Sequence, residues 1–509
     1  MKIERTKNAI NGTITGCVAK ILQLVLNFVL RTIFIKSLGI DYLGLNSLFL
    51  SVLQVLNLAE LGVSTALVFS MYKPIAEDDT QKICELMNLY RYYYRLIGVV
   101  ILSVGLLIMP LLPFLIDGDI PKDINIYVIY LMNLAATVLS YWMFAYRNSL
   151  FNAHQRMDII NIINLIVNFI MYIMQMIVLL AFSNYYFYLF ICIVCPIILN
   201  TIIAIASKKM YPQYLPYGAL PKEERMIINQ KVRDLFTAKI GVVVNTSADT
   251  LVISAFLGLK MVAIYQNYYY IVSSLMAFLS IFFAACTAGI GNSLVLNTQD
   301  ENRKLLYNLN HVLFCTLNIC CPCLICLYQP FMKLWVGENY MLNFDYVILF
   351  AIYLFVEEGP RTMINFKDAG GIWSEDRFRP LVTALVNLVL NVILVKIIGL
   401  YGVLLSTILS FGIIAFPWLI RNIDKCLFKL NIVQYTCQYL NYAIVTFLSC
   451  VLSYYLCGVV PALSQWLDIL IRILICLITS MSIFVIIFGR REETKYMLSI
   501  IRRILRKTI

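Results

Sequence analysis

The sequence predicts an all-α polytopic membrane protein with about fourteen transmembrane helices. Of the 509 residues, 61% are hydrophobic and only 13% are charged, and the mean hydropathy is +0.82. The apolar runs are about 20 residues or longer, which is the length a helix needs to cross a hydrocarbon layer of roughly 30 Å. Lys and Arg also alternate between rich and poor loops. These three observations exclude a soluble protein.

Charged, Pro-rich and Gly-rich breaks separate the predicted spans. The first run, about Ile10 to Leu38, is too long for a signal peptide and lacks a small-residue cleavage site, so we expect it to remain in the mature protein. The spans are centred near residues 24, 57, 106, 135, 170, 195, 246, 277, 322, 352, 389, 411, 448 and 478.

The loop charges predict that both termini are cytoplasmic. Most of the 40 Lys and Arg residues fall on the loops of one side. The other side has only Lys36, Lys122, Lys260, Lys333, Lys396 and Arg472. The net charge of +12 therefore reflects topology, and it does not require a nucleic-acid partner.

Two stretches of the chain repeat. Lys20-Ile21 aligns with Lys239-Ile240, and the same spacing aligns Leu38-Gly39 with Leu257-Gly258. A second pair of segments, 155–170 and 378–393, aligns Arg156 with Arg379, Asn164 with Asn387, and Asn168 with Asn391. Six spans separate the members of each pair, so the repeats have the same orientation. We expect two parallel six-helix bundles related by a pseudo-twofold axis along the membrane normal, an architecture typical of transporters.

The duplication and the breaks predict five parts of the chain. Two further helices follow the second bundle, and the basic amphipathic tail is expected to lie on anionic membrane lipids of the inner leaflet. The parts are an N-terminal six-helix bundle (8–206), a cytoplasmic linker with an amphipathic helix (207–234), a C-terminal six-helix bundle (235–421), two additional transmembrane helices (433–489) and the cytoplasmic tail (490–509).

Five charges lie well inside predicted spans, where each costs about 3 kcal/mol on insertion scales. They are Lys20, Arg31, Glu60, Lys239 and Asp249. At helical spacing Asn27 falls on the stripe of Lys20 and Arg31. Asn46, Asn57, Glu60 and Ser64 share one side of the second span, and Lys239, Thr246 and Thr250 share one side of the seventh.

Two interpretations of these charges remain open. Internal pairing, for instance of Arg31 with Glu60, is one, and Arg31 is also near enough to the outer end to snorkel. The other is a cavity with an excess of cations that binds an anion such as a phosphate or diphosphate.

Histidine, tyrosine and cysteine offer weaker signals. We expect His154 and His311 to be solvated residues at cytoplasmic helix ends, and the clusters YRYYYR (90–95) and YQNYYYI (265–271) to belong to interfacial aromatic belts. The densest cysteine group, CCPCLIC (320–326), has no nearby His or carboxylate. Ordinary packing therefore explains it better than a metal site.

The segment from residue 8 to 79 resembles the opening of the Wzx-type oligosaccharide-repeat-unit flippases, in the polysaccharide transporter family of the MATE-like MOP exporter superfamily. NTSADTLVISAFLGLKMVAIYQNYYYI (245–271) is similar to the family's Asn-x-Asp, Ile-Ser, Leu-Gly and Tyr-x-Asn-Tyr series, with two extra residues between Asn245 and Asp249. PFMKLWVGENY (330–340) and EDRFRPLVTALVNLVLN (375–391) resemble its later signatures. The likeness covers about residues 8 to 420.

This resemblance implies a MATE-like fold and a substrate, an undecaprenyl-diphosphate-linked oligosaccharide, that is moved from the inner to the outer leaflet of a bacterial plasma membrane for surface polysaccharide. It implies Lys20, Arg31 and Lys239 as diphosphate ligands. Asn27, Asn57, Glu60, Thr246, Asp249 and Thr250 are then the polar or ion-coupling candidates of the cavity. A polysaccharide polymerase and chain-length regulators are the implied protein partners. No cofactor is expected beyond a coupling ion, H⁺ or Na⁺.

Two other functions are weighed against this one. A drug or small-cation exporter of the same superfamily should have an acidic cavity, whereas three cations and two anions lie inside these spans. A membrane polysaccharide polymerase or glycosyltransferase needs a large outer loop or a nucleotide-sugar domain, which the sequence lacks. There is also no Walker A motif, so ATP is not expected to drive the protein. We expect no enzymatic activity.

Overall fold

The computed structural model describes residues 5–118, 120–121, 123–460 and 464–499, without the side chains of residues 5–14, 234, 237, 238, 285 and 288. All the regular secondary structure within these ranges is helical, as the sequence predicts. Lys122 and residues 500–509 of the predicted tail lie outside them, and residues 492–499 of the tail are helical. The contacts divide the chain into two compact units, Met1–Gln266 and Asn267–Ile509.

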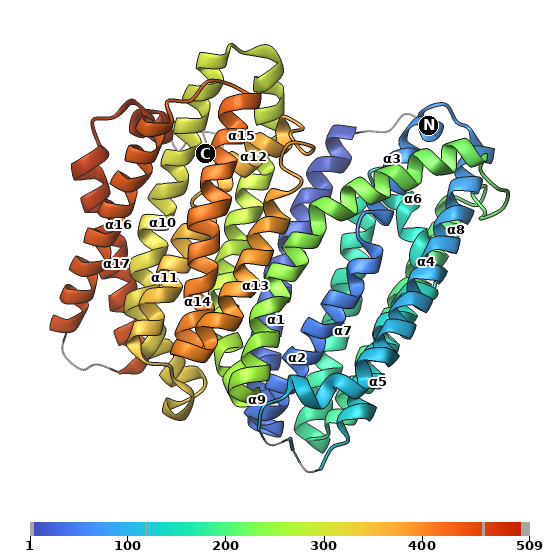
Figure 1. The fold of residues 1–509 in the computed structure, drawn as a ribbon, viewed down its shortest axis with the longest axis horizontal. Coiled ribbons are helices and arrows are strands. Elements are labelled where there is room, and N and C mark those ends of the chain that lie inside the picture. The colour runs from blue at the N-terminus through green and yellow to red at the C-terminus, as the bar shows by residue number, and fades with distance from the viewer. Residues whose placement is uncertain (1–4, 119, 122, 461–463, 500–509) are drawn as a thin grey trace. The chain divides into compact units, whose positions relative to one another are not determined.

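The first unit begins with α1 and ends within α9, a long helix that continues into the second unit (Figure 1). Here α1 packs along α7, and α5 and α7 both pack on α8. The elements are α1 (Arg5–Leu38), α2 (Ile40–Leu56), η1 (Asn57–Glu60), α3 (Val63–Ala76), α4 (Thr80–Ile108), η2 (Met109–Leu115), α5 (Ile126–Trp142), η3 (Ala145–Arg147), α6 (Asn148–Ala153), α7 (Met157–Phe182), α8 (Tyr185–Met210) and α9 (Lys222–Leu296).

The second unit is built around α10, which packs against α11, α16 and α17 (Figure 1). A π-helical stretch, η5, joins α14 to α15. The elements are α10 (Gln299–Trp335), η4 (Glu338–Tyr340), α11 (Phe344–Glu358), α12 (Arg361–Ala369), α13 (Arg379–Ile398), α14 (Leu400–Leu409), η5 (Ser410–Ala415), α15 (Phe416–Cys426), α16 (Ile432–Val459) and α17 (Gln465–Phe488).

Eleven helices of the described chain are long and apolar enough to cross a membrane, and the number is twelve if α5 with η3 and α6, a pair bent by 46°, counts as one span. Two differences separate this number from the fourteen expected spans. Lys239–Ala284 passes as one stretch, although its backbone breaks at Gly258. The expected span near residue 352 is the 15-residue α11, which ends where Gly359 and Pro360 interrupt the helix.

The expected repeat of Leu-Gly appears in the backbone. Gly39, between α1 and α2, has φ 102° and ψ 171°. Gly258, inside α9, has φ 82° and ψ 171°. Only glycine adopts this region readily, so both copies of the dipeptide make the same turn for the same reason. The first unit contains both turns, and the predicted bundle limits at 206 and 235 stay predictions.

Candidate functional site

The second predicted span is a broken helix, which changes the expected alignment of its polar residues. After η1, Leu61 is extended (ψ 122°) and Gly62 has φ 88°. A Cβ at Gly62 would lie 2.8 Å from both the Val232 carbonyl oxygen and the Leu235 Cβ of α9. Gly62 is therefore required both by its own backbone and by the approach of α9. Discontinuous helices of this kind form the binding sites of many transporters.

Glu60 lies at this break within a cluster of polar groups. Tyr94 donates a hydrogen bond of 3.1 Å to Glu60 Oε1, and Tyr90 donates one of 3.1 Å to Tyr94. The Ser64 N–H and the Lys239 ammonium group are the other groups that act on the carboxylate. The cation beside Glu60 is thus Lys239 and not the Arg31 considered from the sequence.

Lys239 and Asn57 complete the cluster. Lys239 Nζ donates to Thr65 Oγ1 over 3.1 Å, which joins the start of the seventh predicted span to α3. Asn57 Oδ1 accepts from the Tyr141 hydroxyl over 3.3 Å, which joins the broken helix to α5. The structure therefore brings together three predicted site residues, Asn57, Glu60 and Lys239.

The predicted residues Asp249 and Thr250 bond to partners across the Gly258 turn, whereas Thr246 bonds to α2. Tyr265 donates to Asp249 Oδ2 over 3.0 Å, and Gln266 Nε2 donates to Thr250 Oγ1 over 2.7 Å. Thr246 Oγ1 accepts from Gln54 Nε2 of α2 over 3.0 Å. Asp249 is buried, and its hydrogen bond to Tyr265 joins the two parts of α9 on either side of the break at Gly258.

Lys20 lines a pocket of about 340 Å³ between α1 and α7. Besides Lys20, the polar side chains that line this pocket are Gln23, Asn161, Asn164, Asn168 and Tyr172. Within the described part of the chain, Lys20, Asn164 and Asn168 form no hydrogen bond or ion pair with another side chain. The sequence did not predict that the asparagines of α7 join Lys20, although helical spacing places Asn161, Asn164 and Asn168 on one face.

Arg31 and Asn27 continue the polar stripe of α1 and are both half-buried. Arg31 lies close enough to the buried Tyr188 of α8 to interact with it electrostatically. The three predicted diphosphate ligands therefore have different neighbours: asparagines around Lys20, Tyr188 near Arg31, and Thr65 with Glu60 around Lys239.

The positions of the second unit that align with the α7 pocket form a closed network. Asn387 Nδ2 donates to Thr407 Oγ1 over 2.8 Å, Asn391 Nδ2 donates to Asn387 Oδ1 over 3.0 Å, and Ser406 donates to Asn391 Oδ1 over 2.6 Å. Both asparagines are fully buried. α13 and α14 thus use all these groups among themselves.

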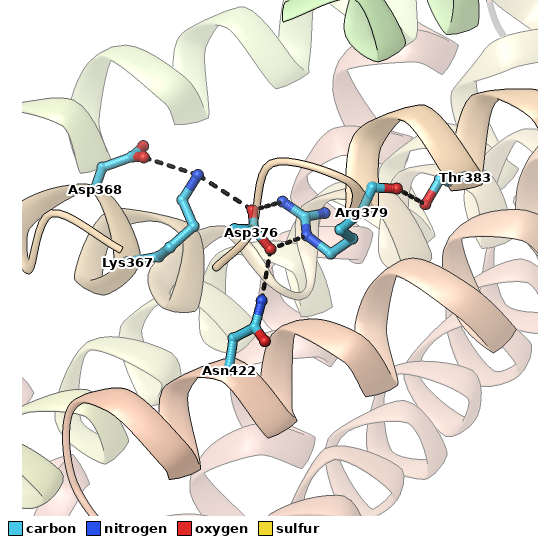
Figure 2. A network of polar contacts seen from close by, with 6 residues as sticks. All are labelled: Lys367, Asp368, Asp376, Arg379, Thr383 and Asn422. Carbon is cyan, nitrogen blue, oxygen red and sulfur yellow. Dashed lines mark hydrogen bonds and ion pairs between the residues drawn. The ribbon is translucent and has the colours of Figure 1, made fainter. Parts of the chain in front are cut away.

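Arg379, which aligns with Arg156, belongs to a buried ionic network (Figure 2). Its Nε and Nη2 atoms each donate to Asp376 over 2.7 Å. Asp376 also accepts from Asn422 Nδ2 over 2.9 Å and lies 3.4 Å from Lys367 Nζ (Figure 2). Lys367 in turn pairs with Asp368 over 2.9 Å. Two cations and two anions compensate one another, with Asp376 at the centre.

No family model matches the sequence, and no curated protein matches it either. Solved structures do match. The lipid II flippase MurJ, in an inward closed conformation, superposes with a TM-score of 0.70 at 16% identity, over 94% of this chain and 99% of that one. The chain has the MurJ fold. At these identities the likeness concerns the fold alone.

MATE and other MOP superfamily transporters have the same fold as MurJ and this chain. An inward-facing multidrug resistance MATE transporter of the MOP superfamily gives a TM-score of 0.60 at 13% identity, over 81% of this chain and 97% of that one. A MOP superfamily transporter from Pyrococcus furiosus, described as having a binding pocket of reverse polarity, gives a TM-score of 0.53 at 13% identity. The match covers 82% of this chain and 94% of that one. The predicted MATE-like, all-α polytopic membrane protein is therefore confirmed.

The interpretation of the tyrosine clusters as interfacial aromatic belts fails for four of the tyrosines, whereas Tyr92 is exposed. Tyr90, Tyr94, Tyr265 and Tyr268 are buried and not part of an interfacial belt, because their hydroxyls bond to polar groups inside the protein. The spacing of four residues between Tyr90 and Tyr94 is the signal that predicts a shared inner face.

The histidines are buried rather than solvated. His154 Nδ1 donates a hydrogen bond of 2.8 Å to the Leu150 carbonyl oxygen, and its ring stacks on Tyr211. Burial lowers the pKa of His154, so the ring is neutral at neutral pH. His311 bonds to the Tyr442 hydroxyl (2.8 Å) and Thr494 (2.9 Å), which joins α10 to α16 and to the start of the tail.

The cysteines of CCPCLIC have thiol neighbours that the local sequence did not reveal. The sulfur atoms of Cys326, Cys457 and Cys476 lie within 4.8 Å of one another, and all three residues are buried. Cys457 and Cys476 come from α16 and α17, more than a hundred residues away. Three thiols at this spacing are a possible ligand set for a thiophilic metal ion, and they also pack as a small apolar cluster.

Proposed function

We propose that the protein is a secondary transporter that moves undecaprenyl-diphosphate-linked oligosaccharide repeat units from the inner to the outer leaflet of a bacterial plasma membrane. In this proposal the broken helix and the α1–α7 pocket of the first unit handle the polar head of the substrate. Both termini face the cytoplasm, and alternating access moves the head across the bilayer.

The observation that carries the proposal is the lining of the α1–α7 pocket. Lys20 is a cation without a carboxylate partner among the described residues, and Asn164 and Asn168 have amide groups with no protein partner there. An ammonium group suits a phosphate, and amides both donate to and accept from sugar hydroxyls. Polar groups exposed to a pocket inside a membrane protein are costly unless a ligand or water satisfies them.

The fold comparisons support the same class of function. MurJ is a flippase of lipid II, and a MOP superfamily transporter with a pocket of reverse polarity is among the other similar folds. A pocket with a cation, on the fold of a lipid flippase, favours an anionic lipid-linked substrate.

A MATE-type exporter of organic cations is less well supported. Such a protein needs carboxylates that a cationic drug can reach. Here Glu60 is engaged by Tyr94 and Lys239, and Asp249 is engaged by Tyr265. We propose these two carboxylates as the groups that couple transport to H⁺ or Na⁺, because Glu60 adjoins the break at Gly62 and Asp249 is bonded across the break at Gly258.

Deletion of the gene in its native host tests the function. We expect lipid-linked repeat units to accumulate in the inner leaflet and surface polysaccharide to disappear. Restoration by the wild-type gene is the control. Unchanged surface polysaccharide in the deletion strain would rule out the proposal.

Arg31 provides a first mutational test in the same strain. Arg31→Ala should insert in the membrane at wild-type levels but fail to restore surface polysaccharide, whereas Arg31→Lys should restore part of it because the charge remains. If Arg31→Ala restores polysaccharide fully, the proposed contact of Arg31 with the diphosphate is wrong.

A further inference from the structure

A second pocket of the first unit contains an unusual concentration of arginine. It has a volume of about 270 Å³ and lies between the first half of α4, the chain before α9 and the first turn of α9. The charged residues that line it are Glu85, Arg91, Arg95 and Arg225. It shares no residue with the α1–α7 pocket or with the Glu60 cluster.

The three guanidinium groups keep N–H groups for a ligand, although one of them, that of Arg225, is hydrogen-bonded to Tyr93. None of them forms an ion pair with a carboxylate in the described part of the chain, and Glu85 itself accepts from Gln81 Nε2 over 3.1 Å. Arg91 Nη2 donates to Asn88 Oδ1 over 3.2 Å, which uses one of its five N–H groups. The pocket therefore has an excess of two positive charges.

The chain around Gly218 forms the wall of the pocket opposite α4, and contacts with α4 hold this wall in place. Asn88 Nδ2 donates to the Gly218 carbonyl over 2.7 Å. Gly218 has φ 79°, and a Cβ there would lie 2.8 Å from Glu85 Cγ. Only glycine allows the chain to approach α4 so closely. Lys82 also pairs with Glu224 over 2.7 Å, which joins α4 to the start of α9.

We propose that this pocket binds the phosphate of a phosphoglycerol group, as found in the headgroup of an anionic inner-leaflet lipid. Guanidinium groups bind phosphate oxygens through paired hydrogen bonds, and three of them around one small pocket match one phosphate. Glu85 in the same wall can accept hydrogen bonds from glycerol hydroxyls, whereas it would repel a second phosphate. The distribution of Lys and Arg predicts that this end of α4 faces the cytoplasm, where the anionic headgroups lie.

The binding site would connect the membrane surface to the Glu60 cluster. Arg91 and Arg95 alternate along α4 with Tyr90 and Tyr94. The Tyr90 hydroxyl donates to that of Tyr94, which in turn donates to Glu60. A bound headgroup would hold the chain at Gly218 and the start of α9 against this part of α4. The segment YRYYYR thus has two faces, one for each site.

Native mass spectrometry of the purified full-length protein in detergent tests the proposal. Phosphatidylglycerol is titrated against phosphatidylethanolamine with the same acyl chains. We expect one tightly bound phosphatidylglycerol, with affinity at least about tenfold lower in R91Q/R225Q, since each charge-assisted hydrogen bond contributes more than a neutral one. K208Q/K209Q, which removes two exposed charges of α8 outside the pocket, is the matched control and should bind within about twofold of wild type.

The remaining arms identify the source of the phosphate. Displacement of the lipid by glycerol 3-phosphate supports recognition of the headgroup, and arginine-dependent binding of inorganic phosphate alone supports a free phosphate ligand. If R91Q/R225Q folds poorly, Arg95→Gln, at an exposed side chain, is expected to reduce binding on its own. The proposal would be overturned if R91Q/R225Q and Arg95→Gln each bound the lipid and inorganic phosphate as well as the wild type does.

Discussion

The two repeats place the same residues on corresponding helices but use them differently. In the first repeat, Asn164 and Asn168 of α7 line an open pocket beside Lys20. In the second, Asn387 and Asn391 of α13 are fully buried and bonded to Thr407 and Ser406. The aligned asparagines thus line a pocket in the first repeat and bond to one another and to neighbouring hydroxyls in the second.

The aligned arginines show the same difference. Arg156 makes a partly exposed pair with Asp158 over 3.0 Å. Arg379 lies in the buried network of Asp376, Lys367 and Asn422 (Figure 2). The aligned polar groups of the second repeat thus stabilise its interior, and we propose that Asn164 and Asn168 of the first repeat act in transport.

The largest expected effect is at Asp376. Asp376→Ala leaves Lys367 and Arg379 buried without the central carboxylate, which should destabilise the protein by about 3–5 kcal/mol. The matched Asp158→Ala, at the more exposed pair, should cost no more than about 1 kcal/mol. Thermal unfolding of the purified variants in detergent measures both, and similar losses would remove the distinction between the repeats.

The next largest effect is expected at the two glycine turns, where the same substitution should lower stability more at Gly258 than at Gly39. Gly39→Ala faces only the strain of its backbone, about 1–3 kcal/mol, since no other atom lies within 4 Å of the added Cβ. Gly258→Ala has the same strain, and its Cβ would also lie 2.6 Å from the Asp117 carbonyl oxygen. The Asp117 N–H donates to the Ser254 carbonyl oxygen over 3.0 Å. Because this bond holds Asp117 in place, its carbonyl oxygen cannot easily move away from the added Cβ. We expect the lower unfolding temperature for Gly258→Ala, and the reverse order would contradict this explanation.

The aligned asparagines distinguish the two repeats further. A substitution in the second repeat should lower stability, whereas one in the first repeat should lower transport. Asn387→Ala leaves buried partners unsatisfied and should lower stability by about 1–3 kcal/mol. Asn164→Ala should change stability by less than about 0.5 kcal/mol but reduce transport. Both are measured by thermal unfolding and by restoration of surface polysaccharide at equal protein levels. A stable Asn387→Ala combined with an unstable Asn164→Ala would reverse our assignment.

Much of the fold could be predicted because its signals are local. Apolar runs and charged loops predicted the helices and the class, and the paired Leu-Gly dipeptides marked the two positions where the structure turns, Gly39 and Gly258. The break at Gly62 was missed because LNLAELGVS contains no proline, and the reason for the break is α9, which packs on Gly62 from a distant part of the sequence. α11 is shorter than expected because Gly359-Pro360 ends the helix.

The candidate site was less predictable because its partners come from other helices. The sequence identified Lys20, Glu60 and Lys239 as unusual charges, but not the asparagines, threonine or tyrosines that surround them. The thiol cluster illustrates the same limit, since Cys326 meets Cys457 and Cys476 only through the packing of α10, α16 and α17. Periodicity describes one helix at a time, and these contacts depend on how helices pack.

Transport by reconstituted protein tests the central claim most directly. Proteoliposomes loaded with an undecaprenyl-diphosphate-linked oligosaccharide should flip it faster than protein-free vesicles, and Lys20→Gln should reduce the rate about tenfold, as expected for loss of one charge-assisted contact. Lys36→Gln, which removes an exposed charge from the same helix outside the pocket, is the matched control and should transport at the wild-type rate. Wild-type flipping by Lys20→Gln would contradict the assignment of the α1–α7 pocket to the substrate.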